Sequence, residues 1–306
     1  MKIVVTSPSF SKNLNLVMEL KRFFPNVKVN EKGTLFKKDE LIEFIGDAEC
    51  LIVGLDKIDD EVLKKCSNLK IISKYGVGLD NVDLDSCKKR NIKIGWTGGV
   101  NKLSVAEMTL GFMLMLSRNL YETSNQLKNK TWNKNGGFQL SGKTIGIIGV
   151  GNIGKEVVRL LKPFKCQILV NDIIEQSEYY KENNLIELPR NEIFEKADII
   201  TIHTTLDNDT RNLVNLELLM KMKTSSYIIN TARSGIIVEN DLKDALKNNI
   251  IAGAALDVYV SEPPSDYELL SLSNLICTPH IGGNAIEAVE AMGMSAIKHV
   301  KAFCKL

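Results

Sequence analysis

Charge of one sign and long hydrophobic runs are both lacking in this sequence. Its 39 Lys and Arg balance 37 Asp and Glu, so the formal net charge of +2 gives no electrostatic footprint for nucleic acid or an anionic membrane. No apolar run approaches the ~20 residues of a membrane span. The run at the N-terminus is too short for a signal peptide and suits a first strand. The 306 residues, 44% apolar and 25% charged, are typical of a globular protein long enough for two domains.

Cysteine and histidine are too scattered to indicate a disulfide framework or a metal site. The six cysteines form no C-x-x-C pair, and several lie beside apolar runs. We therefore expect buried thiols in a reducing, cytoplasmic environment. The three histidines, His203, His280 and His299, do not cluster in sequence, and we predict no bound metal.

Short apolar runs alternate with helical patterns along both halves of the chain. In the first half we predict strands at 2–6, 51–53, 69–73 and 92–94, and helices at 14–24 and 59–66. In the second half we predict strands at 197–203, 227–230, 251–256 and 275–277, and helices at 216–222, 239–247 and 286–304. Such alternation is typical of parallel α/β domains.

Between the halves, the segment 97–100 breaks the pattern and is a candidate hinge. Ser104 and Glu107 then stand at the N-cap and N3 positions of a capping box, which predicts a helix over 105–116. A second, more polar helix is predicted over 120–132.

A glycine-rich stretch at 144–154, TIGIIGVGNIG, carries the clearest functional signal. An apolar strand runs into Gly149, Gly151 and Gly154, and a helical pattern follows from 155 to 161. These glycines suit a tight turn, close approach of backbone to a pyrophosphate, and close packing of helix on strand. A second strand, 167–171, ends at Asp172, at the spacing expected of a ribose-binding carboxylate. The stretch therefore predicts a dinucleotide site, with an ordinary glycine turn as the alternative.

A second glycine pair lies in KYGVGLDNVD at 74–83, after a predicted strand. Gly76 and Gly78 at a strand end can expose consecutive N–H groups as an anion nest. A plain strand-to-helix turn, with Asp83 capping the next helix, explains the segment equally well.

Three polar residues follow three predicted strands of the second half, namely Arg233, Glu262 and His280. Ligands of parallel α/β sheets lie beyond the carboxyl ends of the strands. Arginine can bind a carboxylate through two hydrogen bonds, and histidine is suited to proton transfer near neutral pH. With a nicotinamide, the three predict hydride transfer on a 2-hydroxy or 2-oxo acid. Taken singly, they could be a surface charge, a loop carboxylate and a helix cap.

At this point the sequence resembles the D-2-hydroxyacid dehydrogenase family, and within it the D-3-phosphoglycerate dehydrogenases. The resemblance covers nearly the whole chain, in the family's order. Its motifs are KYGVGLDNVD at 74–83, SVAE at 104–107, GVGNIG at 149–154, HTTL at 203–206, NTARSG at 230–235, ALDVYVSEPP at 255–264 and TPHIGG at 278–283. It departs from the family in HTTL, where a proline is usual, and in Asn284-Ala285, where Ser or Thr is usual.

The resemblance implies a role for each matched residue. Arg233, Glu262 and His280 would be catalytic, and Asp257 would meet the nicotinamide carboxamide. The cofactor, NAD, would be held by the residues of the glycine loop and of later strand ends: Gly149, Gly151, Asn152, Ile153, Gly154, Asp172, Thr204, Thr231, Ala232, Asp257, Gly282 and Gly283. Val77 and Gly78 would hold the substrate carboxylate, and Lys74 a substrate phosphate, unless Lys74 is a solvated lysine at the rim.

The resemblance also implies an architecture of two doubly wound parallel sheets. A flavodoxin-like substrate domain, 1–96 plus 283–306, would enclose an inserted Rossmann NAD-binding domain, 97–282. The helices at 104–132 would form the arm of a homodimer. The resemblance is to the short form without a regulatory domain, so serine feedback is not expected.

Three other functions compete with a phosphoglycerate dehydrogenase-like activity. They are a hydroxypyruvate or glyoxylate reductase, a non-catalytic NAD-sensing protein of the same fold, and formate dehydrogenase. The last is disfavoured because that branch usually has glutamine in place of Glu262. The sequence does not specify the 2-hydroxy acid or the physiological direction.

Overall fold

The computed structural model describes residues 1–306, and the chain folds into two compact units. The first unit comprises Met1–Asn101 and Gly283–Leu306, and the second comprises Lys102–Gly282. The units therefore meet at 101/102 and at 282/283, and the assignment of residues 1–96 plus 283–306 to the substrate and of 97–282 to NAD stays a prediction.

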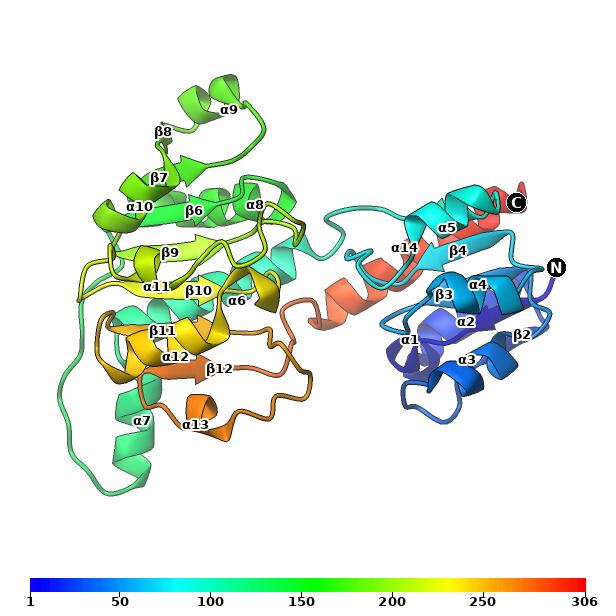
Figure 1. The fold of residues 1–306 in the computed structure, drawn as a ribbon, viewed down its shortest axis with the longest axis horizontal. Coiled ribbons are helices and arrows are strands. Elements are labelled where there is room, and N and C mark those ends of the chain that lie inside the picture. The colour runs from blue at the N-terminus through cyan, green and yellow to red at the C-terminus, as the bar shows by residue number, and fades with distance from the viewer. The chain divides into compact units, whose positions relative to one another are not determined.

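The first unit contains a five-stranded parallel sheet in the order β2-β1-β3-β4-β5 (Figure 1). This is the flavodoxin-like order of doubly wound folds. The strands are β1 (Ile3–Val5), β2 (Val27–Val29), β3 (Cys50–Val53), β4 (Ile71–Lys74) and β5 (Lys93–Gly95). β1, β3 and β4 are buried throughout, as expected of strands covered on both faces.

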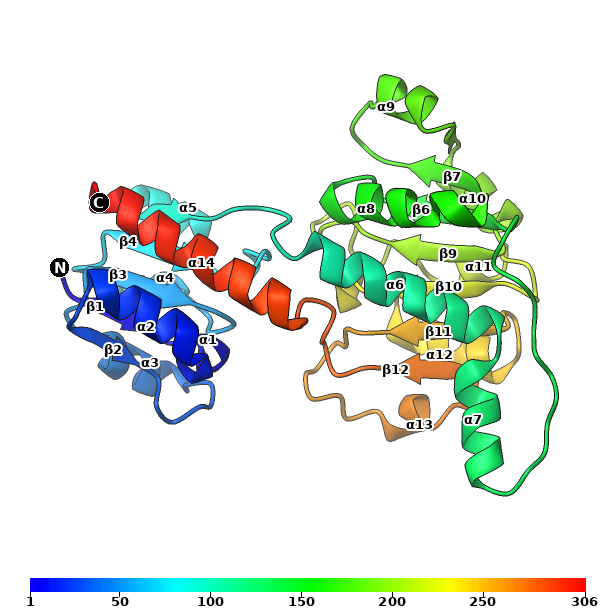
Figure 2. The ribbon, with the colours of Figure 1, turned by 180° about the vertical axis from the view of Figure 1, so that it is seen from behind.

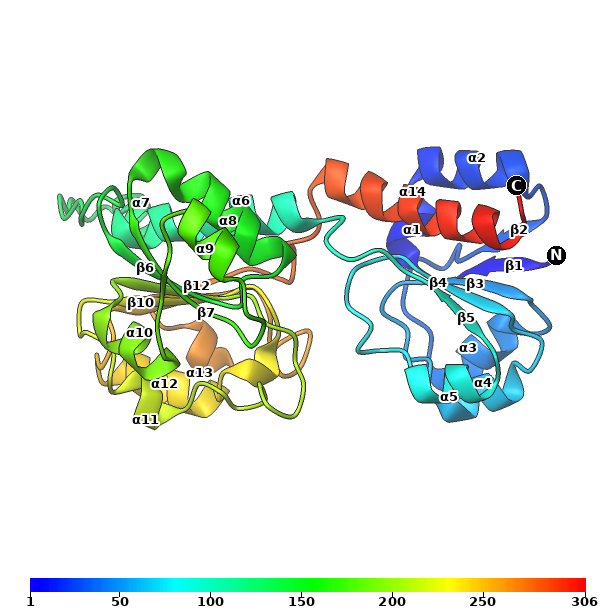
Figure 3. The ribbon, with the colours of Figure 1, turned by 90° about the horizontal axis from the view of Figure 1, so that it is seen from above.

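Helices cover both faces of this sheet (Figure 3). One face carries α1 (Pro8–Lys12), α2 (Leu14–Phe23) and the closing helix α14 (Ile286–Phe303). The other carries α3 (Lys38–Ile45), α4 (Asp60–Lys65) and α5 (Leu84–Lys89). The return of α14 to the first unit is tight, because a Cβ at Gly293 would collide with the side chain of Leu16.

The second unit contains a seven-stranded parallel sheet in the order β12-β11-β10-β9-β6-β7-β8. Its strands are β6 (Thr144–Ile148), β7 (Gln167–Asn171), β8 (Ile186–Glu187), β9 (Ile199–Ile202), β10 (Tyr227–Asn230), β11 (Gly253–Leu256) and β12 (Leu275–Cys277). Numbered from β6, the order is the Rossmann order 3-2-1-4-5-6 with one further strand. The predicted fold class is thereby confirmed.

Two helical layers enclose the second sheet, one of them visible in Figure 2. That layer holds α6 (Lys102–Ser117), α8 (Asn152–Leu161) and α9 (Ser177–Glu182), with α7 (Leu120–Lys128) extending from α6. The other layer holds α10 (Arg190–Lys196), α11 (Leu216–Leu219), α12 (Glu239–Lys247) and α13 (Tyr267–Leu270). Two 3₁₀ turns, η1 (Lys162–Phe164) and η2 (Ser234–Ile236), complete the unit.

Several predicted helix limits are wrong: α11 ends at Leu219 rather than at 222, and α8 begins at Asn152 rather than at 155. α6 begins at Lys102, so Ser104 is not its N-cap, and the Ser104 hydroxyl instead donates to the carbonyl of Gly282. α7 ends at Lys128, where the Asn129 amide caps the last turn, rather than at Trp132. The hydrogen bond from Ser104 to Gly282, which is distant in sequence, takes the place of the capping interaction that the local pattern predicts.

The cysteines carry free thiols, as their scattered positions predict. All six cysteines are thiols, and burial raises the pKa of Cys87 to about 11 and also raises that of Cys66. These thiols therefore stay protonated at neutral pH and act as small apolar residues. No helix combines the length and apolar character needed to cross a bilayer.

Candidate active site

The glycine-rich loop leaves β6 in a conformation that requires glycine. Gly149 has a φ of +93°, and a Cβ there would lie 2.7 Å from the carbonyl carbon of His203. A Cβ at Gly154 would collide with the Gly149 carbonyl oxygen, so the helix can approach the strand only without a side chain. A Cβ at Gly151 would meet no atom within 4 Å, so the backbone there is open to a ligand. α8 begins at Asn152, inside the motif, and its N-terminal amides and dipole favour a phosphate there.

Asp172 is placed at the end of β7, beside this loop. Its Oδ2 accepts a hydrogen bond of 2.5 Å from the Val150 amide, and its Oδ1 accepts one of 2.9 Å from the Ile174 amide. The carboxylate is therefore fixed next to the glycine turn, the place expected for an acid that binds ribose hydroxyls.

The segment after β9 packs against the same turn. His203 is half-buried, and the burial of its ring lowers its pKa to about 3, so its imidazole is neutral at neutral pH. His203 Nε2 lies 2.9 Å from Thr201 Oγ1, whereas its Nδ1 and the buried Thr204 Oγ1 have no hydrogen-bond partner. Unpaired buried polar atoms beside an open glycine loop fit a site that a polar ligand completes.

Arg233, Asp257 and His280 follow the carboxyl ends of three adjacent parallel strands, β10, β11 and β12. Asn230, the last residue of β10, shapes the first of these loops. Its side-chain amide donates to the Arg233 carbonyl at 2.9 Å, and its Oδ1 accepts from the Ala232 amide at 3.0 Å. Asn230 is 1% exposed. The sequence analysis missed this role, although a buried amide within NTARSG was a signal.

Glu262 and His280 form a direct pair. The imidazole Nδ1 lies 2.8 Å from Oε2 and 2.9 Å from Oε1 of the carboxylate. Both side chains remain accessible, at 38% for Glu262 and 40% for His280. Pairing through Nδ1 fixes the ring and directs Nε2 away from Glu262. The arrangement matches a general acid oriented by a carboxylate.

Asp257 organises the loop that carries His280. Its Oδ1 accepts from Thr278 Oγ1 at 2.6 Å and from the Ile281 amide at 2.8 Å, and its Oδ2 accepts from the Gly282 amide at 2.7 Å. The carboxylate is 1% exposed. Its contact with a nicotinamide carboxamide stays a prediction.

Tyr259 is a second residue that the sequence analysis missed. Its hydroxyl lies 3.2 Å from the Leu256 carbonyl and 2.9 Å from the Thr278 carbonyl, so it links the ends of β11 and β12. Nothing in the local sequence indicated this link, because its two partners are far apart in the chain.

The other predicted cofactor residues are distributed as follows. Thr231 is buried and its hydroxyl lies 3.2 Å from that of Thr109. Ala232 is buried beside it. Ile153 lies in the first turn of α8. Gly282 is in the second unit, and Gly283 begins the C-terminal segment of the first.

In the first unit, Lys74 is 5% exposed, so the interpretation as a solvated lysine is wrong. Its ammonium donates to the Gly54 carbonyl and, at 2.5 Å, to Asn81 Oδ1. Asn81 Nδ2 donates in turn to the carbonyls of Gly54 and Asp56. This network holds the turn that contains Val77. Phosphate binding by Lys74 stays a prediction.

The alternative interpretation of the 74–83 segment is also partly realised. Asp83 caps α5, accepting from the Ser86 amide at 2.9 Å. Val77 and Gly78 precede this cap and are half-buried. A cap and an anion site are therefore compatible in one segment.

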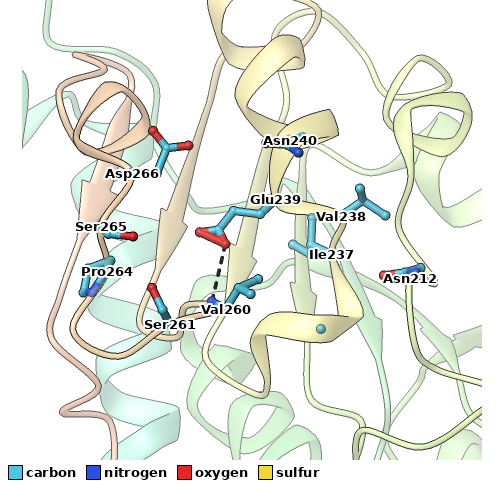
Figure 4. Close-up of a pocket in the computed structure, with 11 residues that line it drawn as sticks. Asn212, Ile237, Val238, Glu239, Asn240, Val260, Ser261, Pro264, Ser265 and Asp266 are labelled. Carbon is cyan, nitrogen blue, oxygen red and sulfur yellow. Dashed lines mark hydrogen bonds between the residues drawn. The ribbon is translucent and has the colours of Figure 1, made fainter.

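A pocket of about 390 Å³ borders the far end of the loop that carries Glu262 (Figure 4). Glu239 lines it and accepts from the Val260 amide at 3.4 Å, the dashed line in the figure. None of Arg233, Glu262 and His280 is among the residues that line it. The reaction is therefore not assigned to this pocket.

The second unit thus has the fold and the strand-end residues of a nicotinamide-dinucleotide-binding domain. Comparison with known proteins agrees, since residues 110–282 match the family model described as D-isomer specific 2-hydroxyacid dehydrogenase, NAD binding domain. The chain is 37% identical to the D-3-phosphoglycerate dehydrogenase of Methanocaldococcus jannaschii, over 98% of the chain and 57% of that protein. It is 36% identical to the hydroxypyruvate reductase of Thermotoga maritima, over 86% of the chain and 87% of that protein.

A solved structure supports the same assignment. The D-lactate dehydrogenase of Aquifex aeolicus, complexed with NAD and lactic acid, superposes with a TM-score of 0.87 at 27% identity, covering 100% of this chain and 96% of that one. The chain belongs to the D-isomer-specific 2-hydroxyacid dehydrogenase family and carries its NAD-binding domain. It spans little more than half the length of the archaeal phosphoglycerate dehydrogenase.

Proposed function

We propose that the chain is an NAD-dependent oxidoreductase that interconverts a D-2-hydroxy acid and its 2-oxo acid. The observation that carries this proposal is the Glu262–His280 pair, with Nδ1 2.8 Å from Oε2. The pair stands at the carboxyl edge of the same sheet as the glycine loop. An ordered, accessible imidazole at that edge is placed for acid–base work.

The residues present fit NAD, which supplies or accepts the hydride when bound. The turn at Gly149, the N-terminus of α8 and the carboxylate of Asp172 would hold it. Asp172 favours NAD over NADP, since a carboxylate repels a 2′-phosphate, and residues 173–175 include no arginine to neutralise one.

Substrate binding and proton transfer are assigned to different side chains. Arg233 binds the substrate carboxylate and polarises the carbonyl beside it, which the planar guanidinium suits. In reduction, protonated His280 donates the proton on Nε2 to the carbonyl oxygen, and Glu262 stabilises the imidazolium through Nδ1. In oxidation the same nitrogen accepts the hydroxyl proton. Val77 and Gly78 offer backbone amides to the substrate carboxylate.

The test is turnover with a panel of 2-oxo acids, followed by NADH absorbance. The panel contains phosphohydroxypyruvate, hydroxypyruvate, glyoxylate and pyruvate, each also assayed with NADPH. We expect oxidation of NADH with at least one acid, and a lower kcat/KM with NADPH. Tight NADH binding without turnover of any acid would favour the non-catalytic NAD-sensing protein instead.

Homodimer formation through residues 104–132 and a cytoplasmic location belong to the same proposal. Leu120, Tyr121 and Leu127 on α7 are 41–56% exposed, an apolar surface suited to a partner subunit. The six thiols suit a reducing compartment.

Sedimentation of the parent and of a Leu127→Asp variant tests the homodimer. A parent protein that sediments as a monomer would contradict the proposed homodimer.

A further inference from the structure

Trp96 is an indole placed directly after β5, and the proposed function assigns it no role. Its Nε1–H donates a hydrogen bond of 2.8 Å to the carbonyl of Val77, which follows β4. β4 and β5 are paired in parallel, with Ser73 opposite Gly95, so the two strand ends lie side by side. The indole therefore reaches the turn to which the proposed function assigns the substrate carboxylate.

The direction of this hydrogen bond fixes the direction of the next amide. The only cis peptide bond of the chain is Glu262–Pro263, so the Val77–Gly78 peptide is trans. In a trans peptide the C=O and the following N–H point to opposite sides. Holding the Val77 carbonyl on the indole therefore turns the Gly78 N–H away from it. Neither the Val77 nor the Gly78 amide donates a hydrogen bond within the chain, so both are available to an anion.

Without such a restraint this peptide could rotate. Gly76 and Gly78 flank Val77, and glycine permits backbone conformations that other residues avoid. Gly76 already adopts a φ of +132°. A peptide flip would exchange the carbonyl for the amide and present an oxygen to the anion.

The residues on either side of Trp96, Gly95 and Thr97, are held by contacts with His299. Thr97 Oγ1, on the next residue, lies 2.8 Å from Nε2 of His299 on α14. A Cβ at Gly95 would lie 2.5 Å from the Cβ of His299, so the strand end is pressed against that helix. Trp96 therefore has a fixed backbone from which to hold the turn.

We propose that Trp96 is a positioning residue for the substrate: its indole N–H holds the Val77–Gly78 peptide so that the Gly78 amide faces the substrate carboxylate. The proposal rests on the proposed function, which assigns the carboxylate to this turn. A single neutral hydrogen bond of this kind corresponds to roughly threefold to tenfold in binding.

The test is Trp96→Phe, which keeps an aromatic ring and removes the donor. We expect KM for the best 2-oxo acid and the inhibition constant of oxamate, a carboxylate probe, to rise together by about threefold to tenfold. We expect kcat and the Kd for NADH to change less than twofold, a split that general misfolding would not produce. Trp132→Phe is the matched control, because Trp132 is 77% exposed and lies in the other unit.

A second variant keeps the test decisive. Trp96→Gln retains a side-chain N–H, so its KM should lie between those of the parent and Trp96→Phe. KM and oxamate inhibition within twofold of the parent in Trp96→Phe would overturn the positioning role while leaving the proposed function intact. Absence of turnover and of oxamate binding in the parent itself would overturn both.

Discussion

The two units share one architecture but differ in what stands at the carboxyl ends of their strands. Both are parallel sheets with helices on each face. In the first unit, Lys74 is buried and committed to Gly54 and Asn81. In the second, the Glu262–His280 pair stays accessible. Layered architecture is therefore common to both units, and the side chains at the strand ends are what distinguish them.

The two units also differ in the surroundings of a buried carboxyl group, Asp56 in the first and Asp257 in the second. Burial raises the pKa of Asp56 in the first unit, where its Oδ2 has no partner. In the second unit, the buried carboxylate of Asp257 is satisfied by two backbone amides and a hydroxyl. It serves the loop that presents the accessible histidine.

The largest effect is expected from removing the acid of the second unit. His280→Ala should lower kcat by ~10²–10⁴, the usual contribution of a general acid. The Kd for NADH, followed by fluorescence, should stay near that of the parent because the glycine loop is untouched. A near-normal kcat would remove His280 from the chemistry and abolish the distinction between the units.

Glu262→Gln tests the partner of that acid. The neutral amide no longer carries the charge that stabilises the imidazolium, so kcat at neutral pH should fall by about tenfold. Glu268→Gln, a salt-bridged surface carboxylate, is the matched control. A kcat equal to that of the parent would show that the 2.8 Å contact serves structure alone.

Asp172→Ser tests the cofactor side of the second unit. Loss of a charged acceptor should lower kcat/KM with NADH by about tenfold. Activity with NADPH should rise, because the repulsion of a 2′-phosphate is removed. The neighbouring Glu175→Gln should leave the ratio unchanged. An unchanged ratio in Asp172→Ser would separate cofactor choice from this residue.

The smallest kinetic effect is expected in the first unit. Lys74→Met removes the donor to Asn81 Oδ1 and one of the two donors to the Gly54 carbonyl, so the free energy of unfolding should fall by about 1–3 kcal/mol. The KM values for phosphohydroxypyruvate and hydroxypyruvate test the predicted phosphate contact, and an equal change for both acids would contradict it. A selective rise for the phosphorylated acid would show that Lys74 also holds phosphate, and the first unit would then share directly in substrate choice.

Much of the fold was readable from local pattern. The limits of β7, β10 and β12 agree with the predicted ones because buried parallel strands are continuous apolar runs. Short edge strands such as β2 and β8 have too few residues to show a period, and the sequence analysis missed them.

Candidate site residues could be named from the sequence where one residue carries one chemistry, as for Arg233 and Asp172, whose roles stay predictions. Positioning side chains were not predictable where they hold backbone that is distant in sequence, as Tyr259 and Trp96 do. Ser104 shows the same limit, since its partner is the Gly282 carbonyl. Local sequence reveals chemical groups, whereas tertiary hydrogen bonds decide which of them are positioned for use.

The most direct test of the central claim traces the hydride itself. The parent protein is incubated with NADH deuterated at its transferable position and with the most active of phosphohydroxypyruvate, hydroxypyruvate and pyruvate, whose products have a stereocentre at C2. The product is analysed by mass spectrometry and chiral chromatography. The account predicts a D-2-hydroxy acid that carries deuterium on C2. An L product, or a product without deuterium on C2, would contradict it.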